Sequence, residues 1–262
     1  MKHQTQHHML KSAPLFRLKH GNHICVLYRD ESHLLETLAP YVAEGLRNGE
    51  RCVCAQKTHM VKRLETTLKS IGVDVEHEIN RGALEIRTEN EVYLGGENFD
   101  AAAMMQVLET SITESVQQGF TGFRFAGEGS WAAGGRAHQL IEYERMIDAA
   151  YEKKPAIIIC QYATNLFSDK TLRGALESHR LALTETMAGA NHSSLMIRKG
   201  DYFVEIVADR ENPGTKFYYV AQQRGSNDIL GWGAEQNFDD AVREGESLIH
   251  ELANRRTRSG PF

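Results

Sequence analysis

The feature that most constrains how this sequence can fold is an alternation of strand-like and helix-like segments over roughly the first 190 residues. The strand-like runs are HICVLY at 23–28, RCVCAQ at 51–56, TGFRFAG at 121–127 and AIIICQY at 156–162. Runs this short and this apolar are typical of strands that are covered on both faces. Their alternation with helices predicts an α/β fold, with a mostly parallel sheet flanked by helices.

Between these runs, apolar residues recur at helical spacing, as Leu34, Leu35 and Leu38 do. The pattern predicts helices over residues 31–47, 58–71, 99–118, 137–153 and 168–178. It predicts one or two further short strands in VDVEHEI (73–79) and ALEIRT (83–88), and strands around 181–186 and 194–198. We expect the last two strands to finish the sheet.

After Gly200 the pattern changes to three successive strands, DYFVEIVAD, TKFYYVAQQ and DILGWGA, which are separated by glycine-containing turn signals. A helix follows, with Asn237 as its expected N-cap. The sequence therefore predicts a small α+β unit of the order βββα. We expect a flexible N-terminus at 1–14, an α/β domain at 15–198, the βββα unit at 200–256 and a tail at 257–262.

Charge and apolar content argue against several classes of function. Thirty Lys and Arg residues against 35 Asp and Glu residues give a net charge of −5, which does not suit a dominant surface for nucleic acid or anionic membranes. No apolar run approaches the length of a membrane span, and the polar start of the chain has no signal-peptide pattern. The four cysteines include no CxxC pair. These features predict a cytoplasmic protein with reduced cysteines.

The connection after the first strand lacks the chemistry of a nucleotide site. A phosphate loop needs glycines, whose backbone N–H groups wrap the phosphates, and a lysine that neutralises them. Residues 28–32 read Tyr-Arg-Asp-Glu-Ser, with neither glycine nor lysine and with two carboxylates. ATPase activity is therefore not expected, and no cofactor is predicted.

The segment from Gly127 to Trp131 is a candidate binding loop, because it directly follows a predicted strand. Ligands of open α/β sheets bind beyond the carboxyl ends of the strands. In this interpretation Glu128 supplies charge and Trp131 a flat apolar wall. The alternative is an ordinary strand-to-helix connection in which Trp131 packs over the sheet. On the following helix, Glu142 and Glu144 point to different faces, so they cannot form an acid–base pair.

The cysteines and histidines invite a metal or thiol interpretation. Cys25, Cys52 and Cys54 are best explained as small buried apolar residues. Cys160 is expected at the carboxyl end of its strand, whereas His23 begins another strand. The two are therefore expected at opposite edges of the sheet, and no metal site is predicted. A nucleophilic role for Cys160, with His179 as the base, remains an alternative.

Several motifs occur together in an order that resembles a known family. They are HICVLYRD at 23–30, EGLRNGER at 44–51, the loop at 127–131, EYE at 142–144, ICQY at 159–162 and a helix ending in His179. The combination resembles the MEDS domain, a sensory module named after methanogens, methylotrophs and a dichloromethane-responsive repressor. The resemblance covers roughly residues 15–198. It implies a relative of the KaiC/RecA-like ATPases that has lost the phosphate loop, which fits the connection at 28–32.

The resemblance also implies a set of functional residues and a role. Carried over by position, the ligand-binding residues are His23, Tyr28, Glu128, Trp131, Glu144, Cys160, Tyr162 and His179. The implied ligands are small hydrocarbon-derived compounds in bacterial or archaeal signalling. Family members often carry a DNA-binding or kinase output domain, but the twenty or so residues before the first strand are too few for a helix-turn-helix. Direct contact with nucleic acid is therefore not expected.

The βββα unit faintly resembles HicB-type antitoxins and double-stranded-RNA-binding domains. Residues 200–256 carry six basic and eleven acidic side chains, a balance that would repel a phosphate backbone. We expect this unit to contact a protein partner or a second copy of the chain. The leading hypothesis is a non-enzymatic sensor in which a small ligand shifts the population between two conformations. The alternatives are an enzyme, either cysteine-dependent or with residual nucleotide handling, and a structural interaction module with a closed pocket.

Overall fold

A computed structural model describes residues 18–94, 99–185, 193–208, 216–224 and 229–258 of the chain. Internal contacts divide the protein into two compact units, with the boundary between His179 and Arg180. In the described part of the chain, no helix combines the length and the apolar character that crossing a bilayer requires.

The first unit is built on a parallel sheet. Its strands are β1 (His23–Tyr28), β2 (Arg51–Gln56), β3 (Leu84–Thr88), β4 (Phe123–Glu128) and β5 (Ala156–Ala163). Neighbouring strands pair in the order β1-β5-β4-β2-β3, and each of these pairs is parallel. Every residue of β5 is buried, as its apolar run predicts. The predicted α/β class with a mostly parallel sheet is confirmed.

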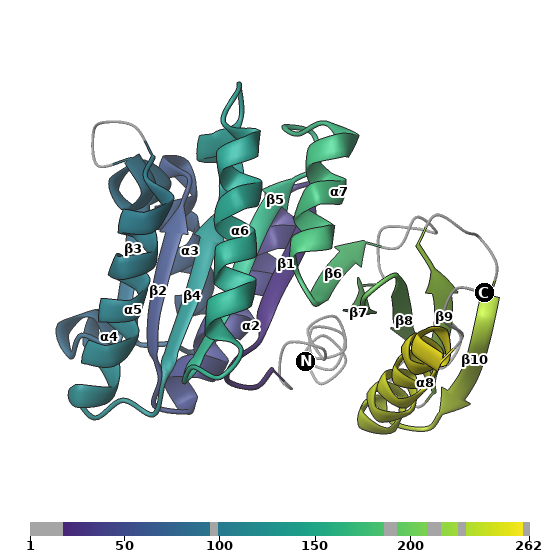
Figure 1. Ribbon diagram of the computed structural model, residues 1–262. Coiled ribbons are helices and arrows are strands. Elements are labelled where there is room, and N and C mark those ends of the chain that lie inside the picture. Colours follow the sequence, from purple (N-terminus) through teal and green to yellow (C-terminus); the bar gives the residue numbers. More distant parts are fainter. Residues whose placement is uncertain (1–17, 95–98, 186–192, 209–215, 225–228, 259–262) are drawn as a thin grey trace. The chain divides into compact units, whose positions relative to one another are not determined.

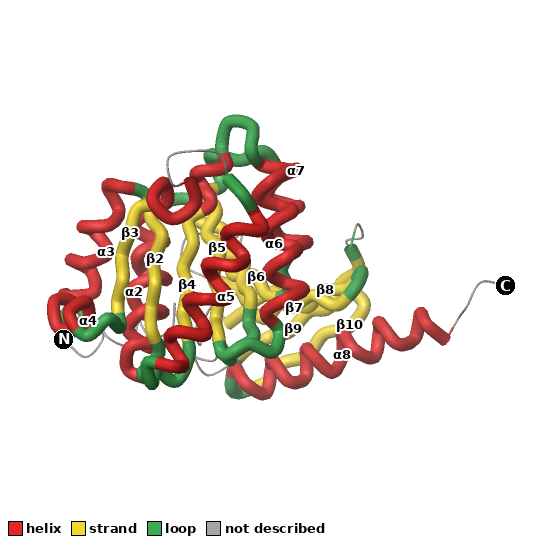
Figure 2. Tube along the Cα trace, turned by 60° about the vertical axis from the view of Figure 1, so that its left-hand side comes forward, coloured by secondary structure: helices red, strands yellow, loops and turns green. Residues whose placement is uncertain are grey.

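Helices cover both faces of this sheet. They are α2 (Glu31–Arg47), α3 (Thr58–Ser70), α4 (Val75–Asn80), α5 (Ala101–Gln117), α6 (Ala137–Tyr151) and α7 (Asp169–Ser178). Helices α2 and α3 lie on one face, and α5, α6 and α7 lie on the other (Figure 1, Figure 2). Two short turns complete the unit, η2 (Asn90–Leu94) and η3 (Gly129–Ala132). The N-caps Asp30, Asp100 and Ser168 each accept a backbone N–H, which fixes where α2, α5 and α7 begin.

Of the one or two strands expected over 73–79 and 83–88, only one forms, because most of 73–79 is the short helix α4. Its alternating V-D-V-E pattern is typical of a strand, but the Asp74 carboxylate accepts the backbone N–H of His77 at 3.0 Å and caps a helix. Strand β2 already pairs with β3 on one side and with β4 on the other, so segment 73–79 cannot pair with it. The following run, ALEIRT, does form a strand, β3.

The second unit is an antiparallel meander with one long helix. Its strands are β6 (Leu181–Glu185), β7 (Ser193–Lys199), β8 (Tyr202–Ala208), β9 (Phe217–Gln223) and β10 (Ile229–Glu235), followed by α8 (Phe238–Arg258). Each strand from β6 to β10 pairs with the next. Strands β6 and β7 thus extend the expected three-stranded unit. The boundary expected near residue 199 falls inside the β7–β8 hairpin, where Lys199 is in register with Tyr202.

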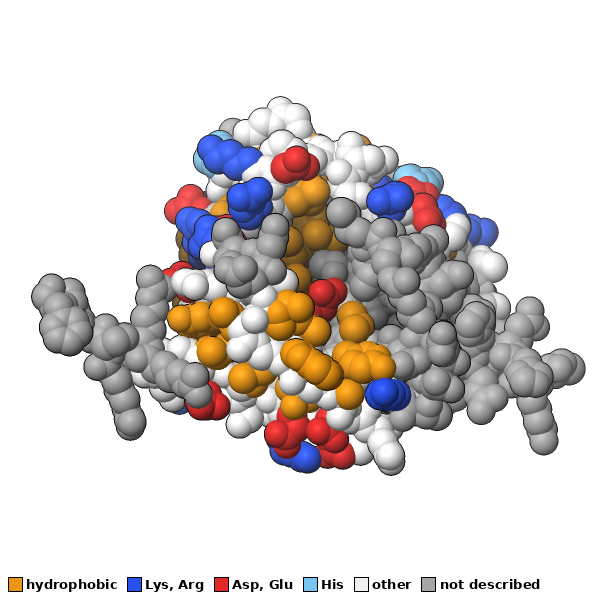
Figure 3. Space-filling model, turned by 90° about the vertical axis from the view of Figure 1, so that its right-hand side faces the viewer, with side chains coloured by type: hydrophobic (Ala, Val, Ile, Leu, Met, Phe, Trp, Pro, Cys, Tyr) orange, Lys and Arg blue, Asp and Glu red, His pale blue; other side chains and the backbone are white. Residues whose placement is uncertain are grey.

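Helix α8 covers one face of this meander. As expected, Asn237 caps the helix, since its side-chain oxygen accepts the backbone N–H of Asp240 at 2.9 Å. On β10, large apolar side chains remain exposed, with Trp232 at 68% of its surface. Figure 3 shows a face on which apolar side chains gather.

Candidate functional site

The register of the parallel sheet sorts the candidate residues onto two faces. In parallel strands, residues in register point to the same face, and successive residues alternate between faces. Cys25, Gly127 and Cys160 occupy one such row. Glu128 is in register with Gln161, one residue further along, so its side chain points to the opposite face. The residues proposed from the sequence therefore do not form a single site.

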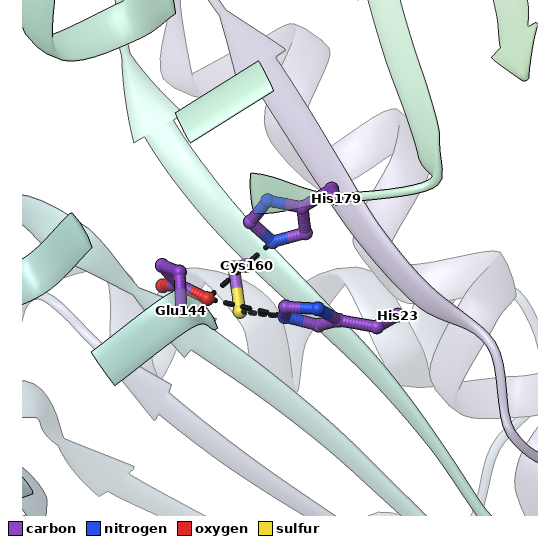
Figure 4. Close-up of side chains that lie close together, drawn as sticks. All are labelled: His23, Glu144, Cys160 and His179. Carbon is purple, nitrogen blue, oxygen red and sulfur yellow. Dashed lines mark hydrogen bonds and ion pairs between the residues drawn. The ribbon is translucent and has the colours of Figure 1, made fainter. Parts of the chain in front are cut away.

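Four buried side chains, His23, Glu144, Cys160 and His179, converge on the face that α6 and α7 cover, and we call them the polar cluster (Figure 4). They come from β1, α6, β5 and the residue that directly follows α7. His23 Nε2 lies 3.1 Å from Glu144 Oε2 and 3.5 Å from Cys160 Sγ. His179 Nε2 lies 3.4 Å from the same Glu144 oxygen. One ligand-type atom from each residue lies within 4.8 Å of the others.

Neighbouring groups hold the polar cluster in place. The Tyr162 hydroxyl donates to the other carboxylate oxygen of Glu144, Oε1, at 2.5 Å. His179 Nδ1 lies 2.7 Å from the carbonyl oxygen of Ala175. A carbonyl can only accept, so Nδ1 carries the proton and Nε2 presents a lone pair to the cluster. On the outer side of His23, Nδ1 lies 3.7 Å from Asp148 Oδ1.

Burial and mutual charges set the protonation states in the polar cluster. Burial and then the charge of His23 lower the pKa of His179 to about 3. Burial lowers the pKa of His23, but nearby carboxylates raise it by more, so the net change is upward. Burial raises the pKa of Glu144, but its imidazole neighbours lower it by more. These directions favour the charged forms of Glu144 and His23, which lie as an ion pair, and the neutral form of His179.

The expectation that His23 and Cys160 lie at opposite edges of the sheet is wrong. Strand β5 runs three residues past Cys160, so Cys160 lies within the strand and not at its carboxyl end. Strand β1 begins at His23, which is opposite Ile158 and only two residues before the Cys160 row. Two residues of strand rise about 6.6 Å, a distance that an imidazole side chain can span.

The arrangement around Cys160 opposes a nucleophilic role. A reactive cysteine needs a lowered pKa. Burial, and then the charge of Glu144, raise the pKa of the Cys160 thiol well above its ordinary value. The imidazole beside Sγ is that of His23, whereas His179 was the base expected from the sequence.

Tyr28 and Glu128 form a separate pair on the opposite face of the sheet. The Tyr28 hydroxyl donates to Glu128 Oε2 at 2.7 Å, and the backbone N–H of Ser130 donates to the other carboxylate oxygen at 3.2 Å. Burial raises the pKa of Glu128 to about 7, although the bond from Tyr28 acts in the other direction. The Lys57 ammonium lies 5.4 Å from the centre of the Tyr28 ring.

Trp131 belongs to a buried aromatic cluster, which we define as Tyr93, Phe99, Trp131 and Tyr143. The ring centroids of Trp131 lie 5.2 Å from Tyr93 and 4.2 Å from Phe99, and Phe99 lies 5.3 Å from Tyr143. Trp131 is only 5% exposed, so the packed alternative describes its state in this structure. Sequence analysis missed Tyr93 and Phe99.

The glycine at 127 reflects the position of Tyr93, because the Tyr93 hydroxyl lies against it. A Cβ atom placed on Gly127 would lie 2.1 Å from the Tyr93 hydroxyl oxygen, so only glycine admits that hydroxyl. Burial, followed by the charges of Cys160 and Glu144, raises the pKa of Tyr93. The aromatic cluster therefore adjoins the polar cluster on the same face of the sheet.

The connection after β1 forms no phosphate cradle. The Asp30 carboxylate accepts the backbone N–H of His33 at 2.9 Å and so occupies the start of α2. Glu31 is paired with His59 at 2.7 Å and with Arg63 at 2.6 Å. Anions bind helix N-termini through free N–H groups, and here a carboxylate of the chain itself takes that place.

Comparison with known families shows the family of the chain that carries this site. Residues 22–180 match the family described as MEDS, the methanogen/methylotroph, DcmR sensory domain. The chain belongs to the MEDS family. The matched range includes the whole polar cluster and the loop from Gly127 to Trp131, so the resemblance inferred from the motifs is confirmed. The role of this MEDS chain is therefore sensory or regulatory.

Two individual proteins are similar to this MEDS chain. The transcriptional repressor DcmR of Methylorubrum extorquens is 26% identical over 169 residues, which are 62% of this chain and 59% of the repressor. The chain thus matches somewhat more than half of that repressor's length. A KaiC-like protein from Pyrococcus horikoshii OT3 is similar in structure, with a TM-score of 0.45 and 14% identity over 77% of this chain and 85% of that chain.

Proposed function

We propose that this MEDS chain senses a small molecule that binds where the aromatic cluster meets the polar cluster. The observation that carries the proposal is a pair of buried polar atoms. Trp131 Nε1 and the Tyr143 hydroxyl have no hydrogen-bond partner among the residues that the structure describes. A buried polar group left unpaired costs on the order of 1–3 kcal/mol, and a ligand with acceptor atoms would remove that cost.

The surroundings favour a small and largely apolar ligand. The four aromatic rings supply apolar walls, and a few polar groups would fix the orientation of the ligand. Glu144 and Asp148 lie on the same helix, and their charges disfavour an anion. Hydrocarbon-derived compounds with one or two polar atoms have the required character. A regulatory output agrees with the repressor relative, and we assign it in this chain to contact with a protein partner.

Helix α6 supplies a route from the ligand to the rest of the protein. Tyr143 and Glu144 are adjacent residues of α6, and one belongs to the aromatic cluster and the other to the polar cluster. A ligand that moves Tyr143 also changes the contacts of Glu144 with His179. His179 ends the first unit and Arg180 begins the second, so the backbone passes the change on. The ligand would act by favouring one of two conformations.

Native mass spectrometry of the full chain from its host organism tests this proposal. We expect a noncovalent adduct that is lost on denaturation. Tyr143→Phe removes only the hydroxyl and should lower the occupancy of the adduct, whereas Tyr202→Phe on β8 should not. An adduct that Tyr143→Phe leaves unchanged would place the ligand elsewhere.

Fluorescence provides a second measurement with defined probes. The chain has two tryptophans, so Trp232→Phe leaves the emission of Trp131 alone. Short-chain alcohols and small halogenated alkanes should change this emission in a saturable way. In the double variant that combines Trp232→Phe with Tyr143→Phe, the change in emission should saturate only at higher probe concentrations. If no probe changes the emission and the native protein carries no adduct, the proposal fails.

A further inference from the structure

The polar cluster brings together two imidazole nitrogens, a sulfur and a carboxylate oxygen, which are donors that bind Zn²⁺ in proteins. In a tetrahedral zinc site, bond lengths of about 2.0–2.3 Å place neighbouring ligand atoms about 3.3–3.6 Å apart. Three of the six separations among the four ligand atoms are 3.1, 3.4 and 3.5 Å, and all four atoms lie within 4.8 Å of one another. Because these atoms already lie near the tetrahedral spacing, we propose that the polar cluster binds one Zn²⁺ ion, with one ligand atom from each of its four residues.

A cation would stabilise the contact between a neutral His179 and Glu144. The proton of His179 is on Nδ1, which faces the carbonyl oxygen of Ala175, so Nε2 presents a lone pair. That lone pair faces a carboxylate oxygen of Glu144 at 3.4 Å, so two acceptors point at each other inside the protein. A metal ion bound to both atoms turns this repulsive contact into two ligand bonds.

The groups around the polar cluster are those that usually support metal ligands. Ligating histidines generally direct their second nitrogen to a carbonyl or a carboxylate, and ligating carboxylates are themselves hydrogen-bonded. His179 faces the carbonyl of Ala175, and His23 faces the carboxylate of Asp148. The Tyr162 hydroxyl binds Oε1 of Glu144 and leaves Oε2 for the metal.

With zinc bound, the buried centre would carry no net charge. As Zn²⁺ binds, the Cys160 thiol and any protonated imidazole of the polar cluster release their protons to solvent. The two negative ligands, Glu144 carboxylate and Cys160 thiolate, then balance the two positive charges of the ion. A neutral centre avoids the large cost of an uncompensated buried charge.

This inference deepens the proposed function, because the ion would lie beside the proposed ligand site, but it depends on different atoms. The test is a zinc titration of the full-length, metal-free chain in competition with a chromophoric chelator. His3, His7 and His8 lie close together near the start of the sequence and are replaced by glutamine in every sample, which removes an unrelated source of binding. We expect one Zn²⁺ per chain, with submicromolar affinity.

Cys160→Ser should weaken zinc binding by about 100-fold or more, since even groups that only support ligands contribute 10–100-fold. Cys54→Ser is the matched control, because Cys54 is an equally buried cysteine on β2 that is not part of the polar cluster. It should leave the affinity unchanged. With Co²⁺ in place of zinc, a thiolate-to-cobalt absorption band should appear in the wild type and in Cys54→Ser, and be absent from Cys160→Ser.

Three results would overturn the metal site. They are no binding at micromolar zinc, equal loss of binding in Cys54→Ser and Cys160→Ser, and full binding in Cys160→Ser. If circular dichroism shows that Cys160→Ser is unfolded, Glu144→Gln takes its place, and unchanged zinc affinity in that variant contradicts the inference. A chain that carries an organic adduct but binds no zinc would contradict the metal site and leave the sensory proposal standing. Zinc binding without any organic adduct or response to the probes would support the metal site and contradict the sensory proposal.

Discussion

Replacing Glu128 with glutamine should change how the stability of this protein depends on pH. Glu128 is fully buried at the end of β4, where it accepts hydrogen bonds from the Tyr28 hydroxyl and the Ser130 backbone. Burial raises its pKa from 4.5 to about 7, because these bonds offset only part of the lost solvation. The folded protein therefore keeps a proton that the unfolded chain has already released.

Stability is lost as the pH rises through this interval. Below about pH 4.5 both states carry the proton, and between about 4.5 and 7 only the folded state does, so a rise in pH favours unfolding. Above about pH 7 the loss is complete. The pKa differs between the states by about 2.5 units, from 4.5 to about 7, and at about 1.36 kcal/mol per unit the loss is about 3 kcal/mol.

Urea unfolding followed by circular dichroism measures this effect. Glu128→Gln removes the titrating group and keeps an acceptor for Tyr28. Relative to the wild type, the free energy of unfolding of the variant should rise by about 3 kcal/mol between about pH 4.5 and pH 8. Any pH-independent cost of fitting the amide cancels in this comparison. Glu142→Gln, at an exposed position of α6, is the control and should follow the wild-type profile.

A constant difference between Glu128→Gln and the wild type across this pH range would refute the reasoning. It would mean that water reaches the Glu128 carboxylate in the folded protein. The burial of the Tyr28–Glu128 pair would then be wrong.

Calorimetry with ATP and Mg²⁺ should show no affinity tighter than about millimolar, because Asp30 already occupies the helix terminus that a phosphate would need, and micromolar binding would contradict this. Gly127→Ala should lower the free energy of unfolding by about 1–3 kcal/mol, since the new Cβ would lie 2.1 Å from the Tyr93 hydroxyl oxygen. Adding Tyr93→Phe should restore part of that loss, and no restoration would mean that another neighbour causes it. Cys160 should react with iodoacetamide far more slowly in the native protein than in urea, because burial raises its pKa, and rapid native labelling would favour the nucleophile hypothesis.

Most of the fold could be predicted because its signals are local. The apolar run at 156–162 marks a strand covered on both faces, and Asp100 and Ser168 mark helix starts through their capping side chains. Where the signals conflict, local reasoning failed. At 73–79 the alternating pattern outweighed the Asp74 cap in the prediction, although the cap determines the structure. Strands β7 and β8 pair through a tight hairpin at Gly200 and Asp201, but the change of pattern after Gly200 was interpreted as a domain boundary and not as a hairpin turn.

The candidate site was harder to predict, because it depends on how strands are offset. His23 and Cys160 meet because β5 continues past Cys160 while β1 begins opposite Ile158, and neither fact is visible in the two motifs. Inference from the residues alone therefore placed His23 and Cys160 apart, whereas the family resemblance put both in one set of functional residues. Tyr93 lies in an irregular turn with no periodic pattern, and only the glycine at 127 records its position.

The charges at both faces of the sheet limit which ligands this domain can accept. At the start of α2, a phosphate would have to displace the Asp30 carboxylate and would then meet Glu31, which is already paired with His59 and Arg63. On the other face, the polar cluster contains the carboxylate of Glu144, and Asp148 lies beside it. Buried carboxylates repel anions strongly, because little water screens them. The capped start of α2 and the carboxylate–imidazole centre therefore have the same consequence for the proposed sensory function: both favour a neutral molecule or a cation over a nucleotide.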